Sequence, residues 1–75
     1  MTAETIRELR DASPFKKFDI HLANGHALTV VSADHLFFIP NSSEFMAVLP
    51  DGAFRIVDLN QVVSLGRTAA RKAKG

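Results

Sequence analysis

Apolar positions near the N-terminus recur at the spacing of a helix. Ile6 and Leu9 lie three residues apart, and Thr2 stands before them with a hydroxyl that can cap the first turn. The dipeptide Ser13-Pro14 marks the end, because the residue before a proline is disfavoured in the α region. We predict a helix of about three turns that docks on a sheet, since so short an amphipathic helix is marginal alone.

The pattern then changes to a period of two around an Asn-Gly pair. Apolar residues alternate with polar or small ones before and after it, at Phe18, Ile20, Leu22, Leu28 and Val30. A two-residue loop would set the two apolar groups on opposite faces. A three-residue loop keeps them on one face by pairing Ile20 with Leu28, and it gives Gly25 the left-handed position of a bulged turn.

Further short apolar segments follow at nearly regular spacing, with turn-forming residues between them. These segments are residues 36–39, 45–49, 54–57 and 62–65. The sequence therefore predicts an α+β domain over residues 1–66. Within the α+β class, we expect a short N-terminal helix followed by a strongly curled antiparallel sheet or a small barrel of five to six strands.

Two of these segments, residues 36–39 and 45–49, are apolar on both faces of the predicted strand. Phe45, Ala47 and Leu49 alternate with Met46 and Val48, so both sides need cover. Either the N-terminal helix covers enough of the outer side, or the remainder is an interface with a second copy or a protein partner. The residues assigned to that interface are Phe37, Phe38, Met46 and Val48.

Composition favours association. A chain of 75 residues is small for a stable core, and its lack of cysteine excludes disulfides and thiolate metal sites. Its charge is segregated: residues 1–66 hold five basic and eight acidic residues, whereas residues 67–75 hold four basic ones. This tail is interpreted as flexible, either simply solvated or contacting an anion or nucleic acid through Arg67, Arg71, Lys72 and Lys74.

No set of residues typical of catalysis or of a metal or cofactor site stands out. His21, His26 and His35 do not have to converge, because the first points away from the apolar face and the second lies at a turn. Asp51 and Asp58 sit at turns, where aspartate makes local hydrogen bonds. We expect a protein that is not an enzyme and carries no cofactor. Without a leader or a spanning segment, we expect it in the cytoplasm with no membrane partner.

Two resemblances extend this interpretation. The runs at residues 14–18, 20–25, 51–54 and 56–59 resemble a group of short uncharacterised bacterial proteins of similar length, which implies no activity. Residues 20–25, followed by Asp34, resemble the first motif of the Sm-like fold, a small RNA-binding barrel that assembles into rings. The family's second-strand glycine, the asparagine after its aspartate and its Arg-Gly pair are missing, since Arg55 precedes Ile56.

The sequence therefore leaves two functions open. The first is a small, non-enzymatic binding or oligomerisation module, which rests on the strands that are apolar on both faces. The alternative is a small SH3- or Sm-like barrel that binds RNA or another nucleic acid, which rests on the hairpin motif and the basic tail.

Overall fold

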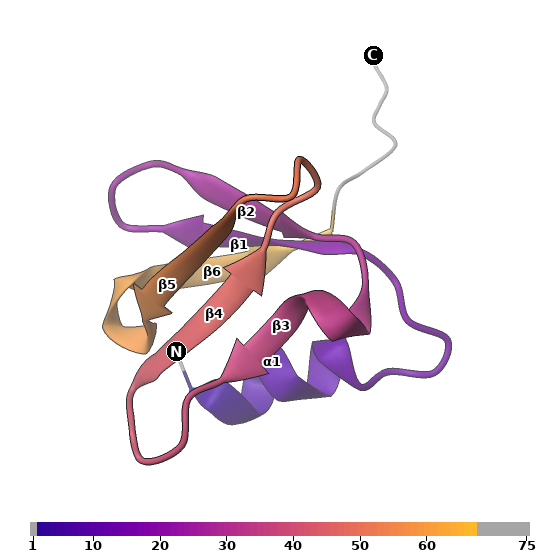
Figure 1. The fold of residues 1–75 in the computed structure, drawn as a ribbon, viewed down its shortest axis with the longest axis horizontal. Helices are drawn as coiled ribbons and strands as arrows, with labels where there is room; N and C mark the ends of the chain where they lie inside the picture. Colours follow the sequence, from indigo (N-terminus) through magenta and orange to yellow (C-terminus); the bar gives the residue numbers. More distant parts are fainter. Residues whose placement is uncertain (1, 68–75) are drawn as a thin grey trace.

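A computed structural model describes residues 2–67 of the chain. A single helix at the start is followed by six strands and two short 3-10 turns (Figure 1). In order these elements are α1 (Ala3–Arg10), β1 (Phe18–Leu22), β2 (Ala27–Val30), η1 (Ala33–His35), β3 (Leu36–Phe38), β4 (Glu44–Val48), β5 (Phe54–Asp58), η2 (Leu59–Gln61) and β6 (Val62–Gly66). The predicted α+β class is confirmed.

The helix forms where the sequence predicts it but is shorter than expected. It spans eight residues and ends at Arg10, where the Asp11 N–H donates to the Arg7 carbonyl at 2.9 Å. Thr2 occupies the cap position with an extended backbone, yet its hydroxyl lies 3.2 Å from the Thr5 hydroxyl and does not cap a backbone N–H. The prediction of a side-chain cap was therefore wrong.

The first hairpin has the predicted register. Ile20 pairs with Leu28 and Phe18 with Val30, so the alternating apolar residues share the buried face. The Leu22 N–H donates to the His26 carbonyl across a three-residue loop, and Gly25 has a φ of +90°. Only glycine adopts that backbone conformation without steric cost, so the position of this residue fixes the loop.

The β4–β5 hairpin repeats the same loop geometry. The Leu49 N–H donates to the Ala53 carbonyl at 2.7 Å, and Gly52 has a φ of +92°. In this loop the Asp51 carboxylate accepts the Ala53 N–H, just as the Asn24 amide oxygen accepts the His26 N–H in the first loop. Each loop thus combines an Asx side chain that closes the turn with a glycine that allows the left-handed step.

The strands form two separate antiparallel sheets instead of a closed barrel. One sheet has the order β2-β1-β6 and the other the order β3-β4-β5. The chain leaves the first sheet through residues 31–35, which include the turn η1, and it returns from β5 to β6 through η2. Because these turns interrupt the ladder at both crossings, β2 does not pair with β3, and the predicted barrel is not formed by the described strands.

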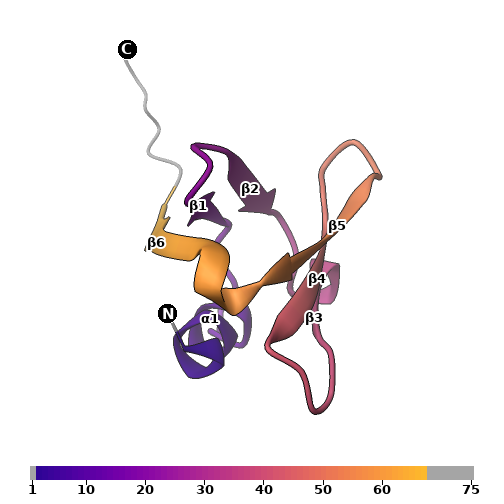
Figure 2. The ribbon, with the colours of Figure 1, turned by 90° about the vertical axis from the view of Figure 1, so that its left-hand side faces the viewer.

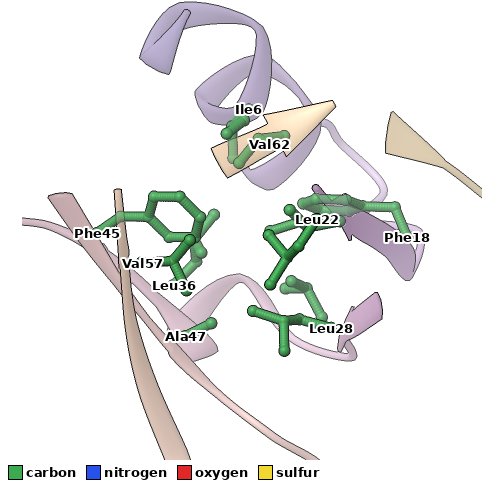
Figure 3. Packing of buried hydrophobic residues seen from close by; sticks show 11 residues of the cluster. Ile6, Phe18, Leu22, Leu28, Leu36, Phe45, Ala47, Val57 and Val62 are labelled. Atoms are coloured by element: carbon green, nitrogen blue, oxygen red, sulfur yellow. The ribbon is translucent and has the colours of Figure 1, made fainter. Parts of the chain in front are cut away.

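The core lies between the two sheets, which face each other with α1 across one open side (Figure 2). Side chains from both sheets and from the helix meet there (Figure 3). The buried members are Ile6, Phe18, Ile20, Leu22, Leu28, Val30, Leu36, Phe45, Ala47, Val57 and Val62. Each large member contributes about 1.5–3 kcal/mol of burial free energy.

One hypothesis from the sequence was that the helix covers the outer side of β4. In the structure the helix does not lie there. Ile6 is fully buried, and it joins the core between the sheets near Val62 (Figure 3). The narrow apolar stripe of the helix is therefore used on the inner side of the fold. The opposite side of the β3-β4-β5 sheet has no described helix or strand against it (Figure 2).

Candidate functional site

A row of apolar side chains crosses the outer side of the β3-β4-β5 sheet. Met46 pairs with Phe37 on one neighbouring strand and with Ile56 on the other, and Val48 pairs with Phe54. Paired residues project to the same side of a sheet, as do residues two apart along a strand. The intervening residues of β4 are buried in the core. These five residues therefore point away from it, and we call them the outer face.

Three members of the outer face are widely exposed. Phe37 is 47% exposed, Ile56 56% and Phe54 60%, and they surround the half-buried Met46 and Val48 on the central strand. Single exposed apolar residues are ordinary on protein surfaces, whereas a contiguous apolar group is less common there. The outer face is such a group, because the register places its members side by side across three strands.

Two carboxylates border one end of the outer face. Glu44 pairs with Asp58, two residues along from the Met46–Ile56 pair, so both side chains project to the same side. Asp58 is held in place, because its two oxygens accept the Ser43 hydroxyl at 3.0 Å and the Asn60 N–H at 2.8 Å. The second contact is the predicted turn-capping role of Asp58. The border is acidic, which disfavours contact between this face and a polyanion.

Phe38 lies on the other side of the sheet from the rest of the predicted interface set. Its ring packs against Phe45 with 6.1 Å between centroids, and the guanidinium groups of Arg7 and Arg10 lie 4.7 Å and 5.4 Å from its centre. Arg10 also forms a two-pronged contact with Asp11, at 2.8 Å and 3.2 Å. This hydrogen bond lowers the pKa of the Asp11 carboxyl. Phe38 thus connects the helix to the sheet.

Two residues of the outer face were not identified from sequence. Phe54 and Ile56 were assigned to a strand but to neither of its faces. The signal that finds them is the turn at Asp51-Gly52, which closes the β4–β5 hairpin and fixes its register. Once Met46 is assigned to the outer side, its pairing partner Ile56 must lie on that side too. Phe54 follows, because residues two apart along a strand share a side.

Two segments that carry basic residues meet at the end of the other sheet. The Arg67 side chain, which follows β6, donates to the Lys16 carbonyl at 3.5 Å, and the exposed Lys17 comes next before β1. We call Lys16, Lys17 and Arg67 the basic end. Of the predicted anion contacts, Arg67 alone is described, since Arg71, Lys72 and Lys74 lie outside the described residues.

A cavity of about 200 Å³ lies beside β5, and we call it the β5 cleft. Residues 55–58 of the strand form one side, and Leu22, Asn24 and Gln61 form the other. The lining combines apolar, amide and charged groups, with no hydroxyl or thiol nucleophile and no histidine. Its carboxylate, that of Asp58, is engaged by the two hydrogen bonds already described.

The three histidines lie in β1, directly after the first hairpin loop, and in η1. Within residues 2–67 no group of three or more histidine, cysteine, aspartate or glutamate residues is placed to hold a metal ion. Over the same residues no polar or charged residue is buried. Within the partly exposed His35, however, the Nδ1 atom is buried and has no hydrogen-bond partner among the described residues.

Comparison with known proteins adds no relative to this description. No family model, curated protein or solved structure matches the chain. Among the described residues no helix is long and apolar enough to cross a bilayer.

Proposed function

We propose that this protein is a non-enzymatic assembly module that associates with a second copy of itself through the outer face. The observation that carries the proposal is the uncovered row Phe37–Met46–Ile56 across all three strands of one sheet. Burying such a row takes apolar surface out of water, and each Å² of apolar surface buried stabilises the complex by about 25 cal/mol. A chain of 75 residues without disulfides has a particular need for that stabilisation.

A second copy suits this surface better than a nucleic acid does. The outer face carries two carboxylates at its border, and no described cation shares that side of the β3-β4-β5 ladder. Two such faces can meet with their strands antiparallel, which keeps the Glu44 and Asp58 borders of the two copies at opposite ends. The acidic groups then stay at the rim, where they remain in water.

Light scattering coupled to size-exclusion chromatography tests this proposal. We expect the mass to rise from that of one chain, 8.2 kDa, toward twice that value as the protein concentration increases. A mass that stays at 8.2 kDa at every concentration contradicts self-association.

A second candidate function is binding of a nucleic-acid backbone at the basic end. It is favoured by the Arg67–Lys16 contact, which brings the Arg67 guanidinium to the backbone of the segment that carries Lys16 and Lys17. The chain continues from Arg67 to three further cations, Arg71, Lys72 and Lys74. Phosphate contacts of this kind are weakened by salt, with a log–log slope of about −0.7 per contact on single strands. We expect Lys16→Gln combined with Lys17→Gln to make the slope for single-stranded RNA shallower. An unchanged slope, or affinity independent of salt, counts against this candidate.

A further inference from the structure

The outer edge of β5 carries backbone groups that no described strand uses. The Leu49 N–H bonds to the Ala53 carbonyl at one end of the β4–β5 hairpin, and the Leu59 N–H bonds to the Ser43 carbonyl at the other. Hydrogen bonding alternates along an antiparallel strand, so Arg55 and Val57 bond to β4. Phe54 and Ile56 therefore direct their N–H and C=O groups away from β4, toward the edge at which the sheet ends.

The β5 cleft lies along this same edge. Its β5 side is residues 55–58, so the space opens beside the unpaired backbone of Ile56. Val57 and Leu22 are the core residues that reach the lining of this cavity of about 200 Å³, one from β5 and the other from β1. Asn24 and Gln61 add amide groups that can bond to a peptide backbone. An unpaired strand beside a side-chain pocket is the arrangement by which sheets bind extended peptides.

Charge defines which peptide fits. Arg55 lines the cleft and lies two residues from Val57, so the two side chains are on the same side of the strand. Arg55 is exposed and has room to meet a carboxylate from a strand laid beside β5. A strand that runs antiparallel to β5 reaches Val57 first and Arg55 two residues later.

A second copy of β5 suits this edge poorly. Two β5 strands paired about a two-fold axis at Ile56 bring the two Arg55 side chains into diagonal contact on one face. An axis at Arg55 places them directly opposite each other. Both registers set like charges together, which destabilises a strand pair. The edge therefore differs from the outer face in the partner it favours.

We propose that the β5 cleft binds an extended peptide segment of another protein, which adds to β5 as an antiparallel strand. The segment carries an apolar residue that lies beside Val57 where the cleft reaches it and, two residues later, an acidic residue that pairs with Arg55. The residue between them exchanges backbone hydrogen bonds with Ile56.

A synthetic peptide tests this proposal directly. The probe is an end-blocked nonapeptide with isoleucine, threonine and glutamate at its three central positions and threonine elsewhere. Binding is measured by fluorescence anisotropy and by ¹H–¹⁵N spectra of the labelled protein. We expect saturable shifts of the Phe54 and Ile56 amides. Methylation of the nitrogen of the central threonine should weaken binding by about tenfold or more, since one backbone hydrogen bond and strand contact are lost.

Charge reversal separates this site from other surfaces. Arg55→Glu should weaken binding of the glutamate peptide by about tenfold or more, and a lysine in place of that glutamate should restore it. Phe37→Lys changes the outer face and should leave peptide affinity unchanged, so the result is independent of self-association. Equal binding of the methylated peptide, absence of saturable shifts along β5, or failure of the lysine peptide to rescue overturns the proposal.

Discussion

Ile56 lies directly across from Met46 in the β4–β5 ladder, with both side chains on the side of the sheet turned away from the core. Of the inward residues that flank them, Phe45, Ala47 and Val57 are buried, and Arg55 is exposed. The strand pair therefore carries apolar residues on both faces, although the described fold covers only one. This relationship leads from the fold to the proposed assembly.

The first prediction concerns the glycine that fixes the first hairpin. Gly25 has a φ of +90°, and a Cβ built there meets nothing within 4 Å, so the cost of a side chain is purely that of the backbone. Gly25→Ala should lower the free energy of unfolding by about 1–2 kcal/mol. Urea denaturation of the unmodified chain and of Gly25→Ala measures this loss.

A second glycine supplies the control for that measurement. At Gly66 the φ is ordinary, and a Cβ would lie 3.5 Å from the His21 ring nitrogen, which is normal contact. Gly66→Ala should therefore leave the unfolding midpoint nearly unchanged. Equal losses in the two variants would show that the left-handed backbone at Gly25 is not what determines the hairpin.

The hairpins also show how far the sequence predicts this fold. The phase of the residues from Phe18 to Val30 was enough to choose the three-residue loop, because the other loop would have exposed one apolar set. Closure into a barrel depends instead on whether β2 continues into β3 and β5 into β6. The turns η1 and η2 decide this, and they are too short and polar to leave a periodic signal.

The candidate site was predicted in part for a related reason. Phe37 and Phe38 are adjacent, so only one of them can project to each side of a strand. The sequence does not show which one, and the contact of Phe38 with Phe45 supplies the answer. Phe54 and Ile56 required knowledge of the strand partner, since exposure of an apolar residue is a tertiary property.

The second prediction compares two phenylalanines with different surroundings. Phe45 is fully buried, whereas Phe54 is 60% exposed. Phe45→Ala should lower the free energy of unfolding by about 3–5 kcal/mol, enough to unfold much of a small domain. Phe54→Ala should change it by about 0.5 kcal/mol or less in dilute solution, where association does not contribute. Thermal melts followed by circular dichroism distinguish them, and similar melting temperatures would contradict the packing described.

The third prediction concerns the Arg10–Asp11 contact. The hydrogen bond from Arg10 lowers the pKa of Asp11 in the folded chain. A lowered folded-state pKa stabilises the fold above the unfolded value of about 3.9, and this contribution disappears as the pH falls through the folded value. Arg10→Gln should therefore raise the pKa of Asp11, measured by carboxyl ¹³C NMR titration.

The difference in the free energy of unfolding between the unmodified chain and Arg10→Gln should also depend on pH. Part of it should shrink in acid, as the Asp11 carboxylate is protonated in both. The remaining part reflects the Arg10–Phe38 contact and should stay. An unchanged Asp11 titration in the variant would show that the contact is not formed in solution.

The fourth prediction tests the outer face against a matched position. Ile56 and Val63 are both β-branched strand residues, 56% and 61% exposed, but Val63 lies in β6 of the other sheet. A lysine at either position should preserve the fold, because each side chain is already mostly in water. Only Ile56→Lys places a charge within the proposed interface.

Sedimentation equilibrium of the unmodified chain, Ile56→Lys and Val63→Lys is the most direct test of self-association through the outer face. We predict a concentration-dependent monomer–dimer equilibrium for the unmodified chain and for Val63→Lys, and a monomer for Ile56→Lys. An unmodified chain that remains monomeric, or a dimer that Ile56→Lys leaves intact, would contradict the account.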